Sequence, residues 1–241
     1  MWLIWSRILA APPDQWQVKA RFRLTNLTTN PPADCNLCPR LVALRAQAQA
    51  KHPDWHNAPV DVWGDTHAKL MIVGMAPGMA GANRTGRPFT GDHAGDLLFQ
   101  TLGRAGLTRG TYDRRPDDGL VLRDAVIANV VRCVPPQNKP VAAEVNACRP
   151  FLLSALNEYE GLKTFFALGR IAHDAFLSTL DLRRAAFPFS HGGQHDLGEH
   201  GVLFDSYHCS RYNTNTRRLT TEMFESAFFS AAKHAKIGNW S

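Results

Sequence analysis

The chain has 241 residues, of which 44% are hydrophobic, so it is long enough to bury a full core. We expect one α/β domain over residues 1–241 rather than two small ones. No apolar run approaches the length that crosses a bilayer, which argues against a membrane protein. Lysine and arginine (27) outnumber aspartate and glutamate (21), and the net charge of +6 favours an anionic partner without identifying it.

Short apolar runs, bounded by glycine, proline or polar residues, alternate with helical segments. Four runs predict buried parallel strands: Lys69–Met75, Val126–Val131, Thr164–Leu168 and Val202–Tyr207. We expect helices at His93–Ala105, Val141–Leu156, Ile171–Leu180 and Thr220–Lys236. This order predicts an α/β three-layer sandwich, with helices on both faces of a mainly parallel, four-stranded sheet. Ligands of such sheets bind at the carboxyl ends of the strands.

Four cysteines form two pairs that lie far apart in the sequence: Cys35, Cys38, Cys133 and Cys148. Thiolates bind soft metals, and four of them would join two distant segments. Disulfides are not expected, because Met1–Ala11 has only a short apolar stretch, broken by Arg7, and is a poor secretory leader. Unpaired core cysteines, tetrahedral zinc and an iron–sulfur cluster all remain compatible with the spacing. Cys209 lies in a different context and is left out of the set.

A glycine-rich segment, Gly74–Asp92, follows the first predicted strand. Its glycines allow the backbone to approach a ligand closely and leave amides free to donate. The segment contains neither a Walker loop nor a G-x-G-x-x-G fingerprint, which weakens a nucleoside triphosphate or dinucleotide interpretation. Asp92 also has a simpler interpretation as the cap of the helix that follows it.

Polar residues interrupt two other strands near their ends. Asn129 stands in an apolar strand, where an amide is costly unless it has partners, and an amide can read a base edge through one donor and one acceptor. Neighbouring backbone could equally satisfy it. His208 follows the fourth strand and leads into a polar, basic loop. A lone histidine there is usually structural, but two other unusual strand ends favour a functional role.

Three segments match one enzyme family, in order and over most of the chain: Gly74–Asp92, Asn129–Pro140 and Ser206–Thr220. They resemble the uracil-DNA glycosylase superfamily, and most specifically its iron–sulfur family 5, the type-b enzymes of bacteria and archaea. The resemblance implies a DNA repair enzyme that extrudes uracil from DNA and hydrolyses the N-glycosidic bond, leaving an abasic site. Other deaminated bases are further candidate substrates.

The resemblance also implies a cofactor. It assigns a [4Fe–4S] cluster to the four paired cysteines, which decides between the metals that the spacing left open. In this family the cluster is understood as structural and lies away from the scissile bond.

The resemblance further assigns a base pocket. Phe89 would stack on the extruded base, Asn129 would pair with its Watson–Crick edge, and His208 would face the base O2, where negative charge develops. The substrate-binding set is Gly74, Met75, Ala76, Phe89, Asn129 and His208. Catalytic roles fall to His208 and Asn129, with Asn83 as the candidate that orients the water.

Two positions depart from the wider superfamily. Relatives with a water-activating acid carry it just after the first strand, where this chain has Ala76, as family 5 does. Many relatives read His-Pro-Ser where this chain has His208-Cys209-Ser210. The first departure leaves water activation without an obvious residue, and the second affects the DNA-probing loop.

Basic and polar residues near the three segments are expected to hold DNA phosphates: Arg84, Arg87, Asn138, Lys139, Ser210, Arg211, Asn213 and Arg217. The expected partner is DNA with uracil or another deaminated base, bound by a monomer in the cytoplasm of a prokaryote.

Two alternative functions remain. A non-catalytic iron–sulfur nucleic-acid-binding protein would not need the pocket residues, and an electron-transfer iron–sulfur protein would not need the glycine-rich loop.

Overall fold

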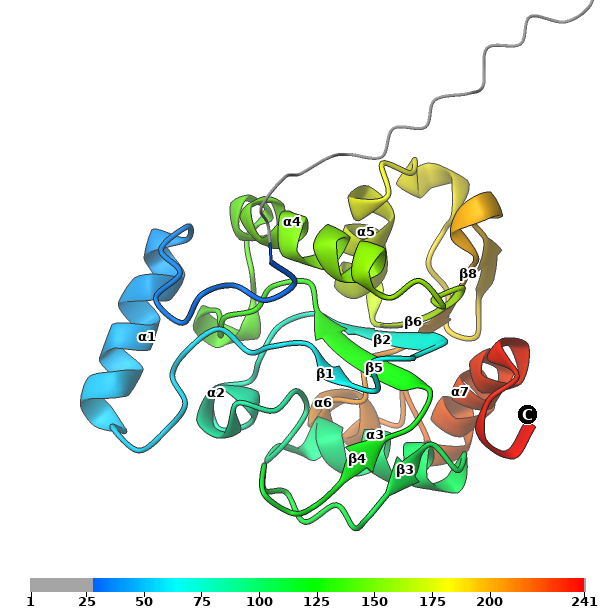
Figure 1. Ribbon diagram of the computed structural model, residues 1–241, viewed down its shortest axis with the longest axis horizontal. Helices are drawn as coiled ribbons and strands as arrows, with labels where there is room; N and C mark the ends of the chain where they lie inside the picture. Colours follow the sequence, from blue (N-terminus) through cyan, green and yellow to red (C-terminus); the bar gives the residue numbers. More distant parts are fainter. Residues whose placement is uncertain (1–27, 241) are drawn as a thin grey trace, which may run out of the picture.

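The computed structural model describes residues 28–240, and a six-stranded sheet forms their centre (Figure 1). In spatial order its strands are β1 (Trp63–Gly64), β5 (Ala125–Asn129), β2 (Leu70–Gly74), β6 (Thr164–Leu168), β8 (Val202–Ser206) and β7 (Gln194–Asp196). The middle four run parallel, and β1 and β7 pair antiparallel at the two edges. The four predicted strands are confirmed, but the sheet has two more strands than expected.

Seven α-helices and one small hairpin complete the described part of the chain. The helices are α1 (Pro39–Lys51), α2 (Ala82–Thr85), α3 (His93–Arg104), α4 (Ala142–Glu158), α5 (Arg170–Thr179), α6 (Arg211–Asn215) and α7 (Thr221–Ala235). The hairpin pairs β3 (Thr108–Arg109) with β4 (Val121–Leu122). The four predicted helices are α3, α4, α5 and α7, whereas α1, α2 and α6 were not anticipated. None of the helices within residues 28–240 is long and apolar enough to span a membrane. Met1–Ala11, discussed above as a poor leader, lies outside the described residues.

Alternate residues of the buried strands face opposite layers, which confirms the three-layer prediction. Leu70 and Ile72 of β2 belong to the core beneath α3 and α7, whereas Met71 and Val73 belong to the core beneath α4 and α5. Figure 1 shows these helix pairs on opposite faces of the sheet. Each buried side chain of this size stabilises the fold by about 1.5–3 kcal/mol.

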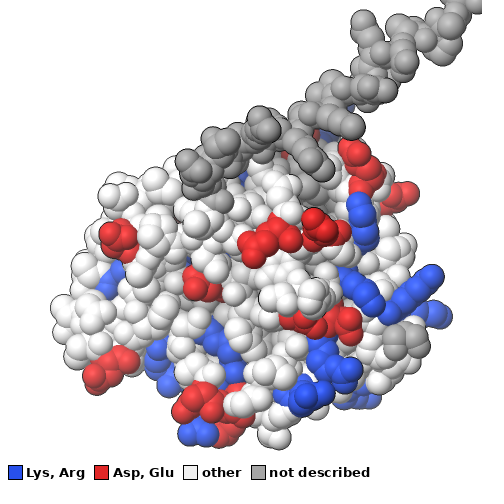
Figure 2. Space-filling model, in the orientation of Figure 1, with Lys and Arg blue, Asp and Glu red and all other residues white. Residues whose placement is uncertain are grey.

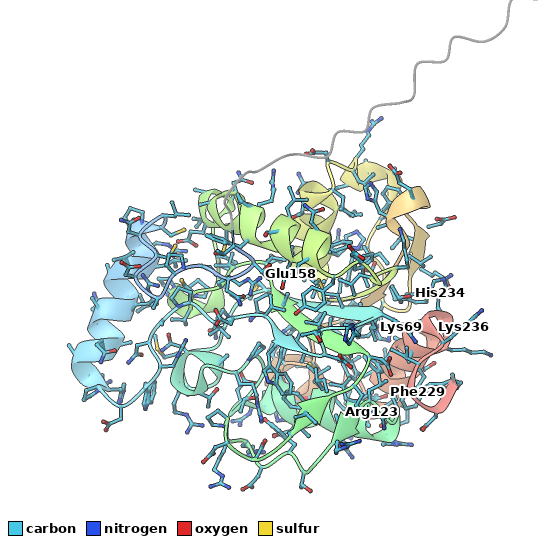
Figure 3. The ribbon with its side chains drawn as sticks, viewed as in Figure 1. Lys69, Arg123, Glu158, Phe229, His234 and Lys236 are labelled. Carbon is cyan, nitrogen blue, oxygen red and sulfur yellow. The ribbon has the colours of Figure 1, made fainter. Side chains whose placement is uncertain are left out.

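The last helix is tied to the sheet along its length. His234 Nδ1 lies 3.0 Å from Thr164 Oγ1, at the start of β6, and Phe229 packs against Trp240 with ring centroids 5.1 Å apart. Figure 3 shows Phe229 and His234 on α7, and Lys236 where the helix ends. The contact with Thr164 lies at the amino end of β6, opposite the carboxyl ends of the strands where ligands bind.

Charged side chains of both signs are interspersed on the face shown in Figure 2. The positive net charge is therefore not concentrated on that face. Exposed arginines instead border the carboxyl ends of the strands, where two cavities open.

Candidate functional site

A cavity of about 610 Å³ lies at the carboxyl ends of β2 and β5, and we call it the strand-end cavity. Its walls come from all three motif segments and include Ala76, Phe89, Asp92, Asn129 and His208. Segments that are distant in the sequence therefore meet at one place, as expected for a parallel sheet.

Gly74 explains why two predicted pocket residues lie so close to the backbone. It is the register partner of Asn129 across β2 and β5. A Cβ atom on Gly74 would lie 2.8 Å from the ring of Phe89 and closer still to Asn129 Oδ1. Only glycine therefore allows both side chains to pack at this strand end.

Asn129 is 2% exposed, and its Oδ1 has no hydrogen-bond partner within residues 28–240. A buried polar atom left unpaired costs about 1–3 kcal/mol. Native proteins rarely keep such an atom without a reason, and a bound ligand is one. Satisfaction of this oxygen by neighbouring backbone, the alternative that the sequence left open, is contradicted.

Phe89 adopts a left-handed backbone conformation, with φ of 55°, which is uncommon for a bulky residue. Its surroundings hold it there: the Tyr112 hydroxyl donates to the Phe89 carbonyl at 3.3 Å, and Gly95 packs directly against that oxygen. Strain of this kind costs about 1–3 kcal/mol and clusters at ligand sites. This backbone conformation places the Phe89 ring on the cavity wall.

His208 lies across the cavity from Phe89, with ring centroids 6.2 Å apart and planes tilted by 32°. Asn213 Nδ2 donates to the His208 carbonyl at 2.8 Å and braces the loop. Burial lowers the pKa of His208, and the charge of Asp92 opposes this shift only in part. The imidazole is therefore neutral at pH 7 and offers one N–H donor.

Asp92 is a functional candidate that received no catalytic role in the sequence interpretation, where capping of the next helix was the simpler explanation. It does cap α3, accepting from the Gly95 amide at 3.3 Å. Its carboxylate also borders the strand-end cavity and packs against Gly78, where a Cβ atom would lie 2.9 Å from Oδ2. The signal in the sequence was its place at the end of the glycine-rich segment.

The structure contradicts two of the predicted roles. Asn83 is fully buried, donates to Asn57 Oδ1 at 2.9 Å and does not line the strand-end cavity, so it cannot orient a water there. Arg87 is 4% exposed, and both of its terminal nitrogens bind Asp118 at 2.7 Å. That ion pair holds the pKa of Asp118 well below its usual range and leaves Arg87 unable to reach a phosphate.

The other predicted phosphate contacts divide into two groups. Five are exposed: Arg84, Asn138, Lys139, Arg211 and Arg217. Of these, Asn138 and Arg211 border the strand-end cavity. Ser210 and Asn213 are partly buried and act within the loop, because the Ser210 hydroxyl accepts from the Asn213 amide to cap α6. Their part in DNA binding stays a prediction.

The four paired cysteines line one internal cavity between α1, α4 and the segment that follows β5. Cys38 caps α1, and Cys148 lies in α4. Burial raises the pKa of the Cys133 thiol to about 12 and that of Cys148 to about 11. Metal binding would therefore have to displace protons from these thiols.

The geometry of these sulfurs bears on the metal that they suit. A Zn–S bond of about 2.3 Å restricts two sulfurs on one ion to about 4.6 Å. In the described part of the chain, no three of the cysteine sulfurs lie within 4.8 Å of one another. The sulfurs are therefore not gathered as closely as a single zinc ion would hold them.

Two buried arginines accompany the cysteines. Arg45 Nη1 lies 3.5 Å from Cys133 Sγ, and the Arg132 amide donates to Cys148 Sγ at 3.3 Å. The guanidinium of Arg132 is 1% exposed and donates to the carbonyl of Val60. Cationic groups and N–H donors at this position would offset the negative charge of four thiolates around a cluster.

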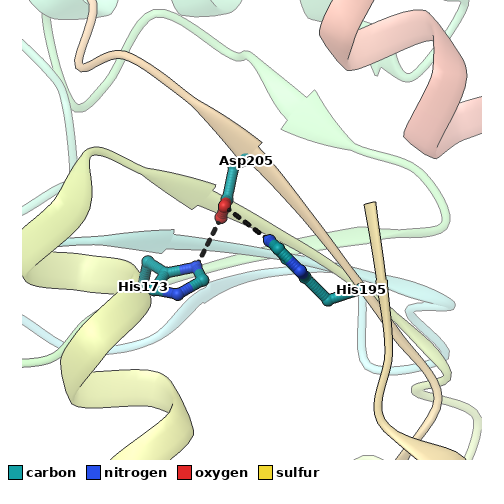
Figure 4. A group of neighbouring side chains, drawn as sticks. All are labelled: His173, His195 and Asp205. Atoms are coloured by element: carbon teal, nitrogen blue, oxygen red, sulfur yellow. Dashed lines mark hydrogen bonds and ion pairs between the residues drawn. The ribbon is translucent and has the colours of Figure 1, made fainter. Parts of the chain in front are cut away.

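A third group of titratable side chains joins α5, β7 and β8 (Figure 4). Asp205 accepts from His173 Nδ1 at 2.7 Å and from His195 Nε2 at 2.9 Å, and His173 Nε2 lies 2.8 Å from the Phe187 carbonyl. Burial acts to lower the pKa of His173, but the hydrogen bond to Asp205, the charge of Asp205 and the bond to the Phe187 carbonyl act together in the opposite direction, and the pKa is raised. Both ring nitrogens of His173 face oxygen acceptors, so we interpret the group as a protonated network rather than a metal site.

Comparison with known proteins agrees with this geometry. Residues 62–232 match the model of the uracil DNA glycosylase superfamily. The chain is 42% identical over 209 residues to the type-5 uracil-DNA glycosylase of Thermus thermophilus, covering 84% of this chain and 94% of that protein. It is 39% identical over 207 residues to the type-5 enzyme of Pyrobaculum aerophilum, covering 84% and 89%. A type-4 enzyme of Thermotoga maritima is 31% identical over 169 residues, covering 68% and 78%. The cavity, its motifs and these similarities together place the chain in the uracil DNA glycosylase superfamily, in its type-5 branch.

Proposed function

We propose that this chain binds DNA, extrudes uracil into the strand-end cavity and hydrolyses the N-glycosidic bond, leaving an abasic site. The observation that carries the proposal is the unpaired, buried Oδ1 of Asn129, which lies beside Phe89 in a cavity of about 610 Å³. The names of the similar enzymes point to the same reaction. Other deaminated bases remain candidate substrates.

Recognition rests on the Asn129 amide. Its Oδ1 would accept from the N3–H of uracil while the amide nitrogen donates to O4. Cytosine has an acceptor at N3 and a donor at C4, so it would oppose both groups of the amide. Phe89 would stack on the base. Extrusion costs a few kcal/mol, least at a mismatch, which itself favours damaged pairs.

Bond cleavage leaves an oxocarbenium-like sugar and an anionic base. A donor that is already in place where the charge develops is worth about 10²–10³ in rate. His208, kept neutral by burial, would donate its N–H to the base O2. Backbone amides near Ala76 would add further donors at the same strand end.

Water activation is the role that Ala76 cannot perform. Asp92 is the carboxylate that borders the cavity, so we assign to it the orientation of the attacking water and the acceptance of its proton. Its second task as the α3 cap fixes the carboxylate in place. This assignment replaces Asn83.

A [4Fe–4S] cluster held by the four paired cysteines would join α1, α4 and the end of β5. Bound there, it supplies a covalent link between distant segments. Electron transfer alone would leave the strand-end cavity unexplained, as would non-catalytic DNA binding. We further propose that the protein acts as a monomer on the nucleoid of a prokaryotic cell.

Incubation of purified protein with a uracil-containing duplex oligonucleotide tests the proposal. We expect free uracil and an alkali-labile strand. Tight binding of the duplex without release of uracil would favour a non-catalytic DNA-binding protein instead.

A further inference from the structure

A second cavity, of about 680 Å³, lies on the other side of His208, and we call it the arginine cavity. Met75 and His208 border both cavities. Its remaining walls come from the end of β6, from residues 189–191 and from the loop before α7. The two cavities therefore lie side by side, with Met75 and His208 at their common border.

Two arginines on its walls lie against aromatic rings. Arg170 Cζ is 5.3 Å from the ring centroid of Phe189, and Arg218 Cζ is 4.5 Å from that of Tyr207. Stacking occupies the face of a guanidinium, while its N–H donors point along the edge. The rings therefore order both side chains before any ligand binds.

Neither arginine is neutralised by a carboxylate. Both are exposed, no ion pair is formed by either within residues 28–240, and the cavity lining contains no acidic residue. Arg87 provides a contrast inside the same molecule: it also stacks on aromatic rings, at 5.0 Å from Trp63, but is buried and paired with Asp118. The stacked arginines of the cavity are thus available for an external anion.

The aromatic walls are themselves held firmly. His191 stacks on Tyr207 with centroids 5.0 Å apart, and its Nδ1 accepts from the Tyr207 amide at 3.2 Å. The network of Asp205 and His173 fixes the Phe187 carbonyl, two residues before Phe189. Preorganisation of this kind lowers the entropy cost of binding.

We propose that the arginine cavity binds the phosphate backbone of the damaged strand next to the extruded nucleotide, with Arg170 and Arg218 as the phosphate ligands. Guanidinium groups match phosphate through paired N–H donors, and an acid-free wall suits a polyanion. The shared border at Met75 and His208 puts the backbone beside the base. This inference rests on the proposed function.

The test is the salt dependence of binding to a uracil-free duplex by Arg170→Gln, Arg218→Gln and the double variant. Removal of one phosphate-binding arginine should reduce the slope of log K against log[salt] by about 0.9. The matched control is Arg109→Gln. Arg109 is exposed, lies on the β3–β4 hairpin after the carboxyl end of α3, and borders neither cavity. The control should keep the wild-type slope, and Arg170→Lys and Arg218→Lys should restore much of the affinity. At subsaturating DNA, single-turnover uracil release should fall in both Gln variants, and raising the DNA concentration should remove this defect.

Slopes equal to that of Arg109→Gln would overturn the inference, as would a rate defect that saturating DNA does not remove. If Arg170→Gln is misfolded, as judged by circular dichroism and iron content, Arg218→Gln still carries the test. Because the slope is measured without uracil, failure of the wild-type protein to release uracil would refute the proposed function and leave this result standing.

Discussion

The strand-end cavity and the four-cysteine site share one short stretch of chain but differ in how their polar atoms are satisfied. Asn129, at the end of β5, borders the cavity, and Cys133, four residues later, lines the cysteine site. At the cavity, a buried oxygen is left unpaired. At the cysteine site, N–H groups of Arg45 and Arg132 already lie against sulfur. The strand-end cavity is therefore suited to a substrate that binds and leaves, and the cysteine site to a group that stays bound.

This difference predicts how each site responds to change. If the proposed cluster links distant segments, loss of a cysteine should make the fold fail before the chemistry does. Loss of a cavity residue removes an interaction with substrate, so the rate should fall in a protein that still folds. The variants below separate these outcomes, from the largest expected effect to the smallest.

Cys133→Ala should abolish the soluble, iron-containing protein, because the proposed cluster would hold α1, α4 and the end of β5 together. Wild-type protein should be brown, because an iron–sulfur cluster absorbs broadly at about 400 nm, whereas the variant should be colourless and largely insoluble. Cys209→Ala is the matched control: that thiol is also buried, but it donates to the Ala94 carbonyl at 3.4 Å and lies outside the set. Zinc without iron in the wild-type protein, by elemental analysis, would contradict the cluster assignment.

Asp92→Asn should lower single-turnover uracil release by about 10²–10⁴-fold, the range for loss of a general base. Asparagine caps a helix about as well as aspartate, so α3 should persist. Asn83→Ala serves as the comparison, since it is buried outside the cavity and should affect stability rather than rate. A nearly normal rate for Asp92→Asn would return Asp92 to a purely capping role.

His208→Ala should reduce single-turnover release by about 10²–10³-fold while uracil-DNA binding stays largely intact, because the lost donor acts on charge that develops in the transition state. Fluorescence anisotropy with uracil DNA and rapid-quench kinetics measure the two quantities separately. A parallel fall in affinity would instead indicate that His208 only braces the loop that Asn213 holds.

Asn129→Ala should slow uracil release by an order of magnitude or more, since polar groups of the bound base would be left unpaired at about 1–3 kcal/mol. Affinity for undamaged duplex should barely change. The check is to measure both in one preparation that folds normally. A folded variant with the wild-type rate would assign Asn129 to the core.

His173→Gln should weaken the pH dependence of stability. The raised pKa of His173 means that its contribution is fully present below pH of about 6.5 and is lost as pH rises through the folded-state pKa. Urea unfolding midpoints of the wild-type protein should therefore fall more between pH 6 and pH 9 than those of the variant. His67→Gln, an exposed control, should follow the wild type. Parallel pH profiles for wild type and His173→Gln would show that the imidazolium is not the stabilising form.

The sequence predicted those parts of the molecule whose signals are local. Apolar runs revealed the four central strands, because buried strands need continuous hydrophobic sequence. The edge strands β1 and β7 escaped prediction, because Trp63–Gly64 and Gln194–Asp196 are two and three residues long and largely exposed. Helix α1 carried a weak signal, a proline directly after Cys38.

At the site, the errors share one physical cause. Arg87 and Asn83 appeared to be exposed loop residues, because their partners Asp118 and Asn57 lie 31 and 26 positions away in the chain. A sequence does not reveal which distant residues pack against a glycine-rich loop and bury its polar groups. Asp92 was given no catalytic role, because capping of α3 already explained an aspartate at this position. Its place on the cavity wall became clear only in the structure.

The most direct test of this account compares the release of uracil and of 5-fluorouracil by folded His208→Ala in single turnover. 5-Fluorouracil is the better leaving group and needs less help with the charge on O2. If donors at the strand ends supply the catalysis, the rate defect should be clearly smaller for 5-fluorouracil than for uracil. A defect of equal or larger size for the activated base would contradict the leaving-group role of His208 and the mechanism built on it.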